Sequence, residues 1–360
     1  MRLVLVTQDF PPDVGGTQTY AYELARRLAR RCARFAVVAP RVAGADAFDR
    51  KVSFEVVRIA ASYDLMFLRA WPTLVRLGSQ FDAALHVQWS TALASLAARP
   101  FGGPPLAFVA AHGRELLLRP LPHPLLNRAY DTVRAWALAR ADGLFPVSTY
   151  TAGLLRRAGV AADRVAVVHN GTDPDHFRPL DASGLRRQLG LADRKVILTV
   201  SRLVSRKGID TVLRALPRVR EAVPEVAYLV VGTGPDRARL EALARSLCVS
   251  DRVHFVGRVP NEKLPLYYNA CDVFAMPSRL APPRVEGFGI VFLEANACGK
   301  PVVGARTGGI PDAIRDGETG LLVPPNDPVA LAERLVRVLR DPAWAQTLGA
   351  AGRRHVVRRA

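Results

Sequence analysis

Short buried strands alternate with helical segments along nearly the whole chain, and this alternation restricts the fold more than any other feature. Runs rich in valine, isoleucine and leucine fall near residues 2–6, 35–39, 54–58, 83–88, 106–111, 143–147 and 165–168. A second series falls near residues 195–200, 227–231, 253–256, 272–276, 301–304 and 320–323. Apolar runs separated by helices are typical of parallel sheets, whose strands are covered on both faces. The sequence therefore predicts an α/β protein with two parallel sheets.

The length of the chain and one turn signal predict its division into domains. The 360 residues exceed one ordinary core and fit two domains of about 150–180 residues. Asn170-Gly171-Thr172-Asp173-Pro174 signals a turn and leads into a polar stretch. We expect an N-terminal domain at residues 1–178, a linker at 179–193, a C-terminal domain at 194–340 and a C-terminal helix at 341–360.

The composition excludes several classes of protein. The net charge of +18 is spread over both halves, and no nucleic-acid-binding module accompanies it, so we expect no nucleic-acid partner. Cysteines 32, 248, 271 and 298 show no metal-binding spacing and suit a reduced, cytoplasmic compartment. No apolar run approaches the roughly 18 residues of a membrane span, and the first residues read as a core strand rather than a signal peptide.

Two acids frame a glycine-containing turn in the second half. Glu286 and Glu294 lie on either side of Gly287 and Gly289, where the chain enters a short apolar helix that Gly299 is expected to close. Free N–H groups at a helix start favour an anion, and glycines allow close approach of a ligand. The turn can hold a phosphate-bearing ligand between two carboxylates that bind hydroxyl groups. A glycine turn before a core helix, with two solvated acids, would leave the same pattern.

Two further loops between a strand and a helix carry residues suited to phosphate. Arg202 and Lys207 follow the strand at 195–200; arginine can bind two phosphate oxygens and lysine supplies a mobile charge. Gly15-Gly16 follows the first strand and precedes a helix expected at about residues 17–31. Ligands in α/β folds bind beyond the carboxyl ends of strands. Two cations on one loop can be merely solvated, but three such loops favour a phosphate-bearing ligand.

Together these segments resemble the family 4 glycosyltransferases, which are retaining enzymes with the GT-B fold. The resemblance covers residues 1 to about 340. The matching segments are Phe10-Pro11-Pro12-Asp13-Val14-Gly15-Gly16-Thr17-Gln18, His112-Gly113, Asn170-Gly171-Thr172-Asp173, Ser201-Arg202 to Lys207-Gly208, Glu286 with Glu294, Gly308-Gly309-Ile310-Pro311 and residues 316–323. The resemblance implies two Rossmann-like domains whose parallel sheets face each other across a cleft. It also implies transfer of a sugar from a nucleotide-diphosphate donor.

The resemblance assigns roles in donor binding to individual residues. Arg202 and Lys207 would neutralise the diphosphate, and the backbone at Gly16 would approach the same phosphates. Glu294 matches the ribose-binding glutamate of the family, and Glu286 would bind hydroxyls of the transferred sugar. The backbone of Phe288, Gly289 and Ile290 would help to position that sugar.

The remaining site residues come from the first half. His112 follows the strand at 106–111, and the resemblance implies that it stabilises the transition state beside the sugar; as a histidine before glycine it also suits a structural turn. The expected catalytic residues are thus His112, Arg202, Lys207 and Glu286. Asp13 and Gln18 are candidates for acceptor contacts, with helix capping as the alternative.

We expect neither a metal nor another cofactor. No Asp-x-Asp pair directly ends a predicted strand, as in the glycosyltransferases that hold the diphosphate through a metal, and here cationic side chains would take that role. The segments at residues 10–20, 112–115 and 276–287 look closest to bacterial phosphatidylinositol mannoside mannosyltransferases. That likeness suggests GDP-mannose as donor and a lipid-linked or glycan acceptor.

Two predicted helices raise the question of a membrane surface. Residues 62–77 and 116–136 mix aromatic and aliphatic residues with arginines, as in helices that lie among anionic lipid headgroups. Core-facing amphipathic helices produce the same pattern. A cytoplasmic protein that binds the inner face of the membrane peripherally fits the first interpretation.

The same residues bear on other functions of α/β proteins. Gly15-Gly16 lacks the Gly-x-Gly-x-x-Gly spacing of a dinucleotide-binding dehydrogenase, and phosphorylases need a pyridoxal-binding lysine in a much longer chain. A nucleotide-sugar epimerase, or a non-catalytic protein that binds a sugar nucleotide or a lipid, remains an alternative. The resemblance also concerns the C-terminus, because members of the family commonly continue with a helix that crosses back to the first domain. The helix expected at residues 341–360 fits either a truncated form of this crossover helix or a short natural end.

Overall fold

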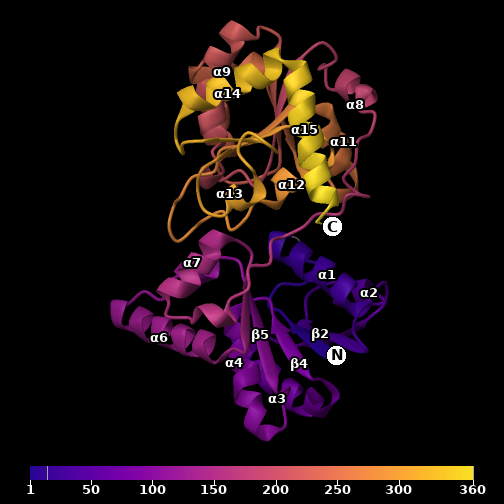
Figure 1. Cartoon of the computed structure of the whole chain (residues 1–360), viewed down its shortest axis with the longest axis vertical. Coiled ribbons are helices and arrows are strands. Elements are labelled where there is room, and N and C mark those ends of the chain that lie inside the picture. The colour runs from indigo at the N-terminus through magenta and orange to yellow at the C-terminus, as the bar shows by residue number, and fades with distance from the viewer. Residues whose placement is uncertain (14, 360) are drawn as a thin grey trace. The chain divides into compact units, whose positions relative to one another are not determined.

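The chain forms two compact units, Met1–Val168 and His169–Ala360, each built around one parallel sheet of six strands (Figure 1). The computed structural model describes residues 1–13 and 15–359. Val14 of the first glycine motif and Ala360 at the end of the predicted C-terminal helix therefore lie outside the described residues. Across the described residues, no helix has both the length and the apolar character needed to cross a bilayer.

The first unit has strand order β3-β2-β1-β4-β5-β6. Its strands are β1 (Arg2–Val6), β2 (Arg34–Pro40), β3 (Glu55–Ile59), β4 (Ala83–His86), β5 (Leu106–Ala111) and β6 (Gly143–Pro146). Its α-helices are α1 (Gly16–Ala29), α2 (Ala45–Asp49), α3 (Met66–Leu77), α4 (Trp89–Ala98), α5 (Arg114–Leu117), α6 (Pro124–Arg140) and α7 (Thr149–Arg157). Along β1, Leu3 and Leu5 join the apolar cluster that includes residues of α1, while Val4 and Val6 join the cluster that includes residues of α3. Because side chains alternate along a strand, this continuous apolar run is buried on both faces of the sheet.

The second unit has strand order β12-β11-β10-β7-β8-β9. Its strands are β7 (Lys195–Val200), β8 (Val226–Val231), β9 (Val253–Gly257), β10 (Val273–Met276), β11 (Val302–Ala305) and β12 (Leu321–Val323). Its α-helices are α8 (Ser183–Gln188), α9 (Ile209–Ala222), α10 (Arg237–Ser246), α11 (Leu264–Ala270), α12 (Ile290–Ala297), α13 (Ile310–Ala313), α14 (Pro328–Arg340) and α15 (Pro342–Val357). Helices α9 and α14 pack together over one core cluster, and α12 contacts α15 (Figure 1).

Both sheets are wound in the same way. In each unit the third, second and first strands are followed by the fourth, fifth and sixth. The direction of winding therefore changes between β1 and β4 in the first unit, and between β7 and β10 in the second. Loops diverge at such a switch point and leave room for a ligand beyond the carboxyl ends of the strands. The predicted α/β fold with two Rossmann-like parallel sheets is confirmed.

The boundary between the two units, after Val168, lies earlier in the chain than the sequence predicted. Residues 165–168 form no strand; Val165 makes only an isolated bridge to Leu144. The segment predicted as a linker, 179–193, belongs to the second unit and contains α8. Two side chains account for this difference: Asn269 binds Arg178 O and Leu180 N, and Arg186 binds Ala270 O. These polar residues are therefore held against α11 rather than left as a free connection.

Candidate active site

The loop after β7 is fixed against the segment that follows β10. Gly208 has φ +74°, and a Cβ there would lie 2.1 Å from Pro277 O. Only glycine can hold this conformation at this distance. The 3₁₀ turn Ser205–Lys207 is consequently held beside the chain that leads to Glu286. Two loops from neighbouring strands thus meet at the switch point of the second sheet.

Buried Lys207 and partly buried Arg206 and Glu286 form a charged cluster at this place. Lys207 Nζ lies 2.5 Å and Arg206 Nη1 2.8 Å from Glu286 Oε2. Burial lowers the pKa of Lys207, with Glu286 opposing the shift. For Glu286, burial alone would raise the pKa, but the charges of Lys207 and Arg206 outweigh it and the pKa is lowered. The carboxylate is therefore held ionised between two cations.

The backbone around Glu286 is fixed by a second close approach. Glu286 O accepts a hydrogen bond from Gly309 N at 2.9 Å. The neighbouring Gly308 has φ +53°, and a Cβ there would lie 2.4 Å from the same oxygen. The Gly308-Gly309 motif thus supports the turn that carries Glu286.

The start of α12 offers unoccupied backbone donors. Gly289, with φ +93°, precedes the first helical residue, Ile290, and no side chain caps this end. Phe288 is buried and its ring lies 5.6 Å from that of His169, which anchors the turn. The helix ends as predicted, with Gly299 at φ +75° beyond the final residues. An uncapped helix start beside a partly buried cationic cluster is suited to an anion.

Glu294 occupies a different environment from Glu286. Tyr268 Oη donates a hydrogen bond to Glu294 Oε2 at 2.5 Å. Burial raises the pKa of Glu294 to about 7, and the Tyr268 hydrogen bond only partly offsets this effect. Near neutral pH this carboxyl can therefore exist in both protonation states.

Arg202 lies at the start of the same loop and remains available to a ligand. Its side chain is exposed, and its charge contributes to the lowered pKa of Lys207. Among the described residues its guanidinium has no hydrogen bond or ion pair. The structure thus places the charge of Arg202 close enough to affect Lys207, which pairs with Glu286. Their role in holding the donor phosphates stays a prediction.

In the first unit, His112 lies beyond the end of β5. Its ring packs edge-on against Tyr20 of α1, with 4.6 Å between ring centres. Its Nε2 atom is buried and has no hydrogen-bond partner among the described residues. Burial lowers the pKa of His112 despite the nearby Glu115. A neutral imidazole with an unsatisfied nitrogen is suited to a polar group of a ligand.

The two glycines at the start of α1 differ in the space around them. A Cβ on Gly16 would meet no atom within 4 Å, whereas a Cβ on Gly15 would lie 2.3 Å from Gln18 Oε1. A side chain at Gly15 would displace the end of the Gln18 side chain, whereas Gly16 leaves the first turn of α1 accessible.

The two predicted acceptor residues differ in their surroundings. Asp13 is exposed. Gln18 donates a hydrogen bond to Asp9 Oδ1 at 2.8 Å, and Gln88 Nε2 donates one to Asp9 Oδ2 at 2.6 Å. Burial raises the pKa of Asp9. Gln18 is therefore part of a polar network centred on Asp9 at the switch point of the first sheet.

Several members of these clusters were not identified from the sequence. Arg206 adjoins Lys207 in the chain. Because arginines are frequent throughout the sequence, its position alone did not mark it as a site residue. Tyr268 and Gln88 come from other elements and carried no local signal. Glu115 accepts hydrogen bonds from His112 N and Gly113 N at 2.6 and 3.1 Å, and its position three residues after His112 resembles a capping pattern.

Carboxylates do not gather around a possible metal in the described part of the chain, where no group of three His, Cys, Asp or Glu residues has suitable geometry. One Asp-x-Asp pair, Asp173 and Asp175, follows the first unit. Asp173 Oδ1 accepts hydrogen bonds from Asp175 N and His176 N. This pair therefore shapes a turn.

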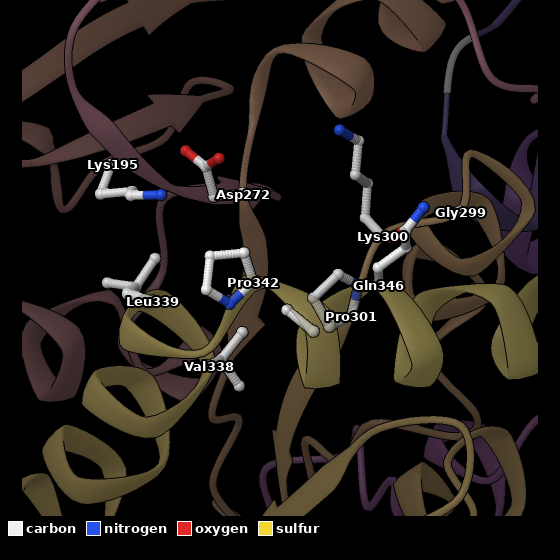
Figure 2. A pocket seen from close by; sticks show the side chains of 10 residues that line it. Lys195, Asp272, Gly299, Lys300, Pro301, Val338, Leu339, Pro342 and Gln346 are labelled. Carbon is white, nitrogen blue, oxygen red and sulfur yellow. The ribbon is translucent and has the colours of Figure 1, made fainter.

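A pocket of the second unit lies at the opposite edge of its sheet (Figure 2). It has a volume of about 230 Å³, and Lys195, Asp272 and Lys300 line it with residues from the ends of α14 and α15. Lys195 begins β7 and Asp272 directly precedes β10, so the pocket lies at the amino ends of these strands. Because α/β folds bind ligands at the carboxyl ends, we assign the active site to the Lys207–Glu286 cluster instead.

Comparisons with known proteins show the family of the chain. Residues 14–176 match the model of Glycosyltransferase Family 4, and residues 183–355 match that of Glycosyl transferases group 1. The chain is 38% identical to a GDP-mannose-dependent alpha-(1-6)-phosphatidylinositol monomannoside mannosyltransferase of Mycolicibacterium smegmatis, over 98% of this chain and 92% of that protein.

Two further comparisons extend this result. A monoacylated-phosphatidylinositol-monomannoside mannosyltransferase of Corynebacterium glutamicum is 33% identical, with coverage of 99% and 93%. The structure of Anabaena Alr3699/HepE in complex with UDP has a TM-score of 0.82 and 24% identity, covering 100% of this chain and 95% of that one; it shows the likeness of the fold. The chain therefore belongs to the family 4 glycosyltransferases and is a glycosyltransferase with the GT-B fold.

Proposed function

We propose that the protein transfers mannose from GDP-mannose to a phosphatidylinositol mannoside, with retention of configuration. The observation that carries the site assignment is the partly buried Lys207–Arg206–Glu286 cluster beside the uncapped start of α12. Similarity to the two mannosyltransferases over nearly the full chain supports the choice of donor and acceptor.

The cluster suits the charge that develops when a glycosyl–phosphate bond breaks. In this proposal, Arg202 and Lys207 hold the diphosphate, and the N–H groups of Gly289 and Ile290 approach it. Negative charge grows on the leaving phosphate in the transition state, where fixed cations in a buried site stabilise it most. Glu286 orients Lys207 and accepts hydrogen bonds from hydroxyls of the sugar. These roles are positioning and electrostatic rather than acid–base.

The other residues have proposed roles in binding. Glu294 would accept hydrogen bonds from the ribose hydroxyls, and the backbone of Phe288 would help to place the sugar. In the first unit, Gly16 leaves backbone N–H groups accessible to phosphate, and His112 Nε2 would bond to the transferred sugar. Gln18, with Asp13 nearby in the chain, would contact the acceptor.

The test is a turnover assay with purified protein, labelled GDP-mannose and phosphatidylinositol monomannoside, with UDP-glucose as the competing donor. Lys207→Ala and Glu286→Ala should each lose activity by a factor of about one hundred or more. Lys195→Ala is a matched control, because this lysine lines the pocket at the opposite sheet edge. Full activity of Lys207→Ala would contradict the site, and exclusive use of UDP-glucose would contradict the donor.

We propose that cations of the chain replace a metal in holding the diphosphate. Two basic side chains already converge within 2.8 Å of one carboxylate oxygen at the site. Activity should therefore persist in excess EDTA, and added Mg²⁺ should not raise it. Loss of activity in EDTA that Mg²⁺ restores would contradict this point.

We also propose peripheral binding to the anionic inner face of the membrane. Helices α3 and α6 expose Leu68, Trp71, Leu125, Leu126 and Trp136, and both carry arginines. The protein should sediment with phosphatidylglycerol vesicles at low salt, and the bound fraction should fall as salt screens the attraction. Absence of sedimentation at low salt would remove the proposal while leaving the transferase assignment intact.

A further inference from the structure

A cavity of about 340 Å³ lies among three helices of the first unit. Helix α4 packs against both α3 and α6, and all three contribute to the walls. Every lining side chain is apolar. The lining residues are Phe67, Leu68, Trp71, Leu93, Ala94, Ala97 and Trp136.

The cavity opens to solvent through large apolar side chains. Leu68 is 56% exposed, and the indoles of Trp71 and Trp136 are 38% and 44% exposed. Phe101, itself exposed, packs edge-on against Trp71 with 5.7 Å between ring centres. Exposed aromatic residues around an apolar depression are unusual for surface facing only water, and they are typical of a binding surface.

Of the three helices around the cavity, α3 and α6 carry several arginines, and α4 has no charged side chain. Their sequences contain a single acid, Asp131, which already pairs with Arg119 and Arg134. Arg69, Arg76 and Arg128 are exposed and have no ion pair among the described residues. The Arg140 guanidinium lies 4.6 Å from the centre of the Trp136 ring, directly beside the cavity. The ligand therefore has to combine an apolar part with a negative charge.

We propose that this cavity accepts one acyl chain of an anionic phospholipid, whose headgroup phosphate is held by Arg140, the arginine that lies against Trp136. A neutral apolar ligand would not account for the excess of arginine, and an anion alone would not account for the apolar cavity. Adsorption to a membrane surface requires no cavity, so this site goes beyond the peripheral binding proposed above. It does not depend on which sugar or acceptor the enzyme uses.

The test is a titration of the full chain with dioctanoyl phosphatidylglycerol kept below its micelle concentration. Binding is followed by calorimetry and by tryptophan fluorescence, because Trp71 and Trp136 line the cavity while Trp89 is buried. We expect saturable binding to one site. Ala97→Phe, at an exposed position of the wall, should fill the cavity and weaken binding at least tenfold.

Two further variants keep the test decisive. Leu68→Asp places a carboxylate at the exposed rim and should weaken binding to a similar extent without disturbing the core. Ala129→Phe adds the same ring as Ala97→Phe at an exposed position of α6 that does not line the cavity, and it should bind like the wild type. Circular dichroism and turnover with a saturating acceptor would check that each variant is folded.

Three outcomes would overturn the proposal. The first is wild-type affinity in both Ala97→Phe and Leu68→Asp. The second is equal weakening in Ala129→Phe, which would indicate adsorption to the whole surface. The third is equally tight binding of glycerol 3-phosphate, which would indicate a site for phosphate alone. If Ala97→Phe loses binding of the short-chain lipid but still sediments with phosphatidylglycerol vesicles, adsorption to the membrane surface is separate from binding of an acyl chain in the cavity.

Discussion

Glu286 and Glu294, two partly buried carboxylates of the second unit, differ in pKa because their immediate neighbours differ. Glu286 is held ionised by Lys207 and Arg206, whereas Glu294 has the neutral Tyr268 hydroxyl as its hydrogen-bond partner. Burying a charge is unfavourable unless another charge or several hydrogen bonds compensate it. The two acids, eight positions apart in the sequence, therefore differ in charge near neutral pH: Glu286 is ionised, and Glu294 is present in both protonation states.

Replacing Glu286 by glutamine tests the electrostatic role of this residue. The amide keeps the size of the side chain but removes the charge that compensates the buried Lys207. We expect kcat to fall by about a hundredfold, with a smaller change in affinity for GDP. The measurement is a kinetic comparison with the wild type, combined with GDP titration. Unchanged kcat would show that the carboxylate only shapes the turn.

The raised pKa of Glu294 predicts a pH dependence of nucleotide binding. Its pKa in the folded protein is about 7, above the ordinary 4.5, so the carboxyl is protonated at pH 6 and ionised at pH 8. An ionised carboxylate accepts hydrogen bonds from ribose hydroxyls better than a neutral acid. Affinity for GDP should therefore rise between pH 6 and pH 8, and Glu294→Gln should show no such rise. A rise of equal size in the variant would assign it to another group.

The same shift affects stability in the opposite sense. Because the folded pKa lies above the unfolded value, the folded state binds more protons between about pH 4.5 and pH 7. The contribution of this group to stability is therefore lost as the pH rises through that range. Chemical unfolding of wild type and Glu294→Gln at pH 5 and pH 8 would measure the difference.

Asp9 provides a further test at the level of single residues. Its two oxygens accept hydrogen bonds from the amides of Gln18 and Gln88. Asparagine cannot accept both bonds, because one of its two positions becomes an N–H₂ donor. Asp9→Asn should therefore raise KM for the acceptor several-fold while KM for GDP-mannose changes little. An equal rise in both constants would indicate a general structural role.

At the level of elements, both candidate anion sites use a glycine at the start of a helix, but for different physical reasons. Gly289 has φ +93°, and a Cβ there would lie 2.7 Å from Phe292. A Cβ added at Gly16 would meet no other atom within 4 Å outside its chain neighbours and the helix backbone. The first glycine is required by the backbone itself, and the second leaves space in front of α1.

This difference predicts opposite effects of alanine at the two positions. Gly289→Ala should reduce the stability of the second unit by about 2 kcal/mol or more, because the left-handed conformation and the contact with Phe292 are both unfavourable. Gly16→Ala should leave thermal stability unchanged but reduce turnover, if phosphate approaches the start of α1. Thermal melting and kinetics of both variants would check this, and full activity of Gly16→Ala would count against that role.

The sequence predicts elements best where the apolar pattern is long. All six strands of the second sheet were placed to within about two residues, because each is a continuous run rich in apolar residues, although β9 is only partly buried. The pattern failed at residues 165–168, where Val167 and Val168 are 38% and 54% exposed; β-branched residues there suit an extended chain without a second neighbouring strand. It also failed at 179–193, where polar side chains bind backbone groups of α11 and its surroundings, which no local pattern reveals.

Site residues could be predicted where they lie in loops that join consecutive elements, and not where they come from distant segments. Arg202, Lys207 and Glu286 lie in loops between consecutive elements, so the α/β pattern predicted that they would meet at one sheet edge. Tyr268 and Gln88 reach their carboxylates from helices or loops distant in the sequence, and only the three-dimensional fold reveals these contacts.

At the level of the whole molecule, each unit has its own sheet and its own apolar clusters. The residues assigned to the donor lie mainly in the second unit. A ligand that binds only the folded state stabilises the unit that holds it, by about 2.7 kcal/mol at one hundred times its Kd.

Calorimetric unfolding of the full chain tests this assignment. If the units unfold in separate steps, GDP should raise the midpoint of one transition and leave the other nearly unchanged. Arg202→Ala should reduce the shift. An equal shift of both transitions, or a shift that survives in Arg202→Ala, would place the main nucleotide contacts elsewhere.

The identical winding of the two sheets has an evolutionary consequence. Each unit supplies its own ligand-binding edge from its own strand order, and no strand of one unit completes the sheet of the other. Selection can therefore alter the loops of one half without rebuilding the hydrogen-bonded framework of the other. Descendants of such a chain can acquire new acceptors while they inherit an old donor, and each half can carry a separate ancestry.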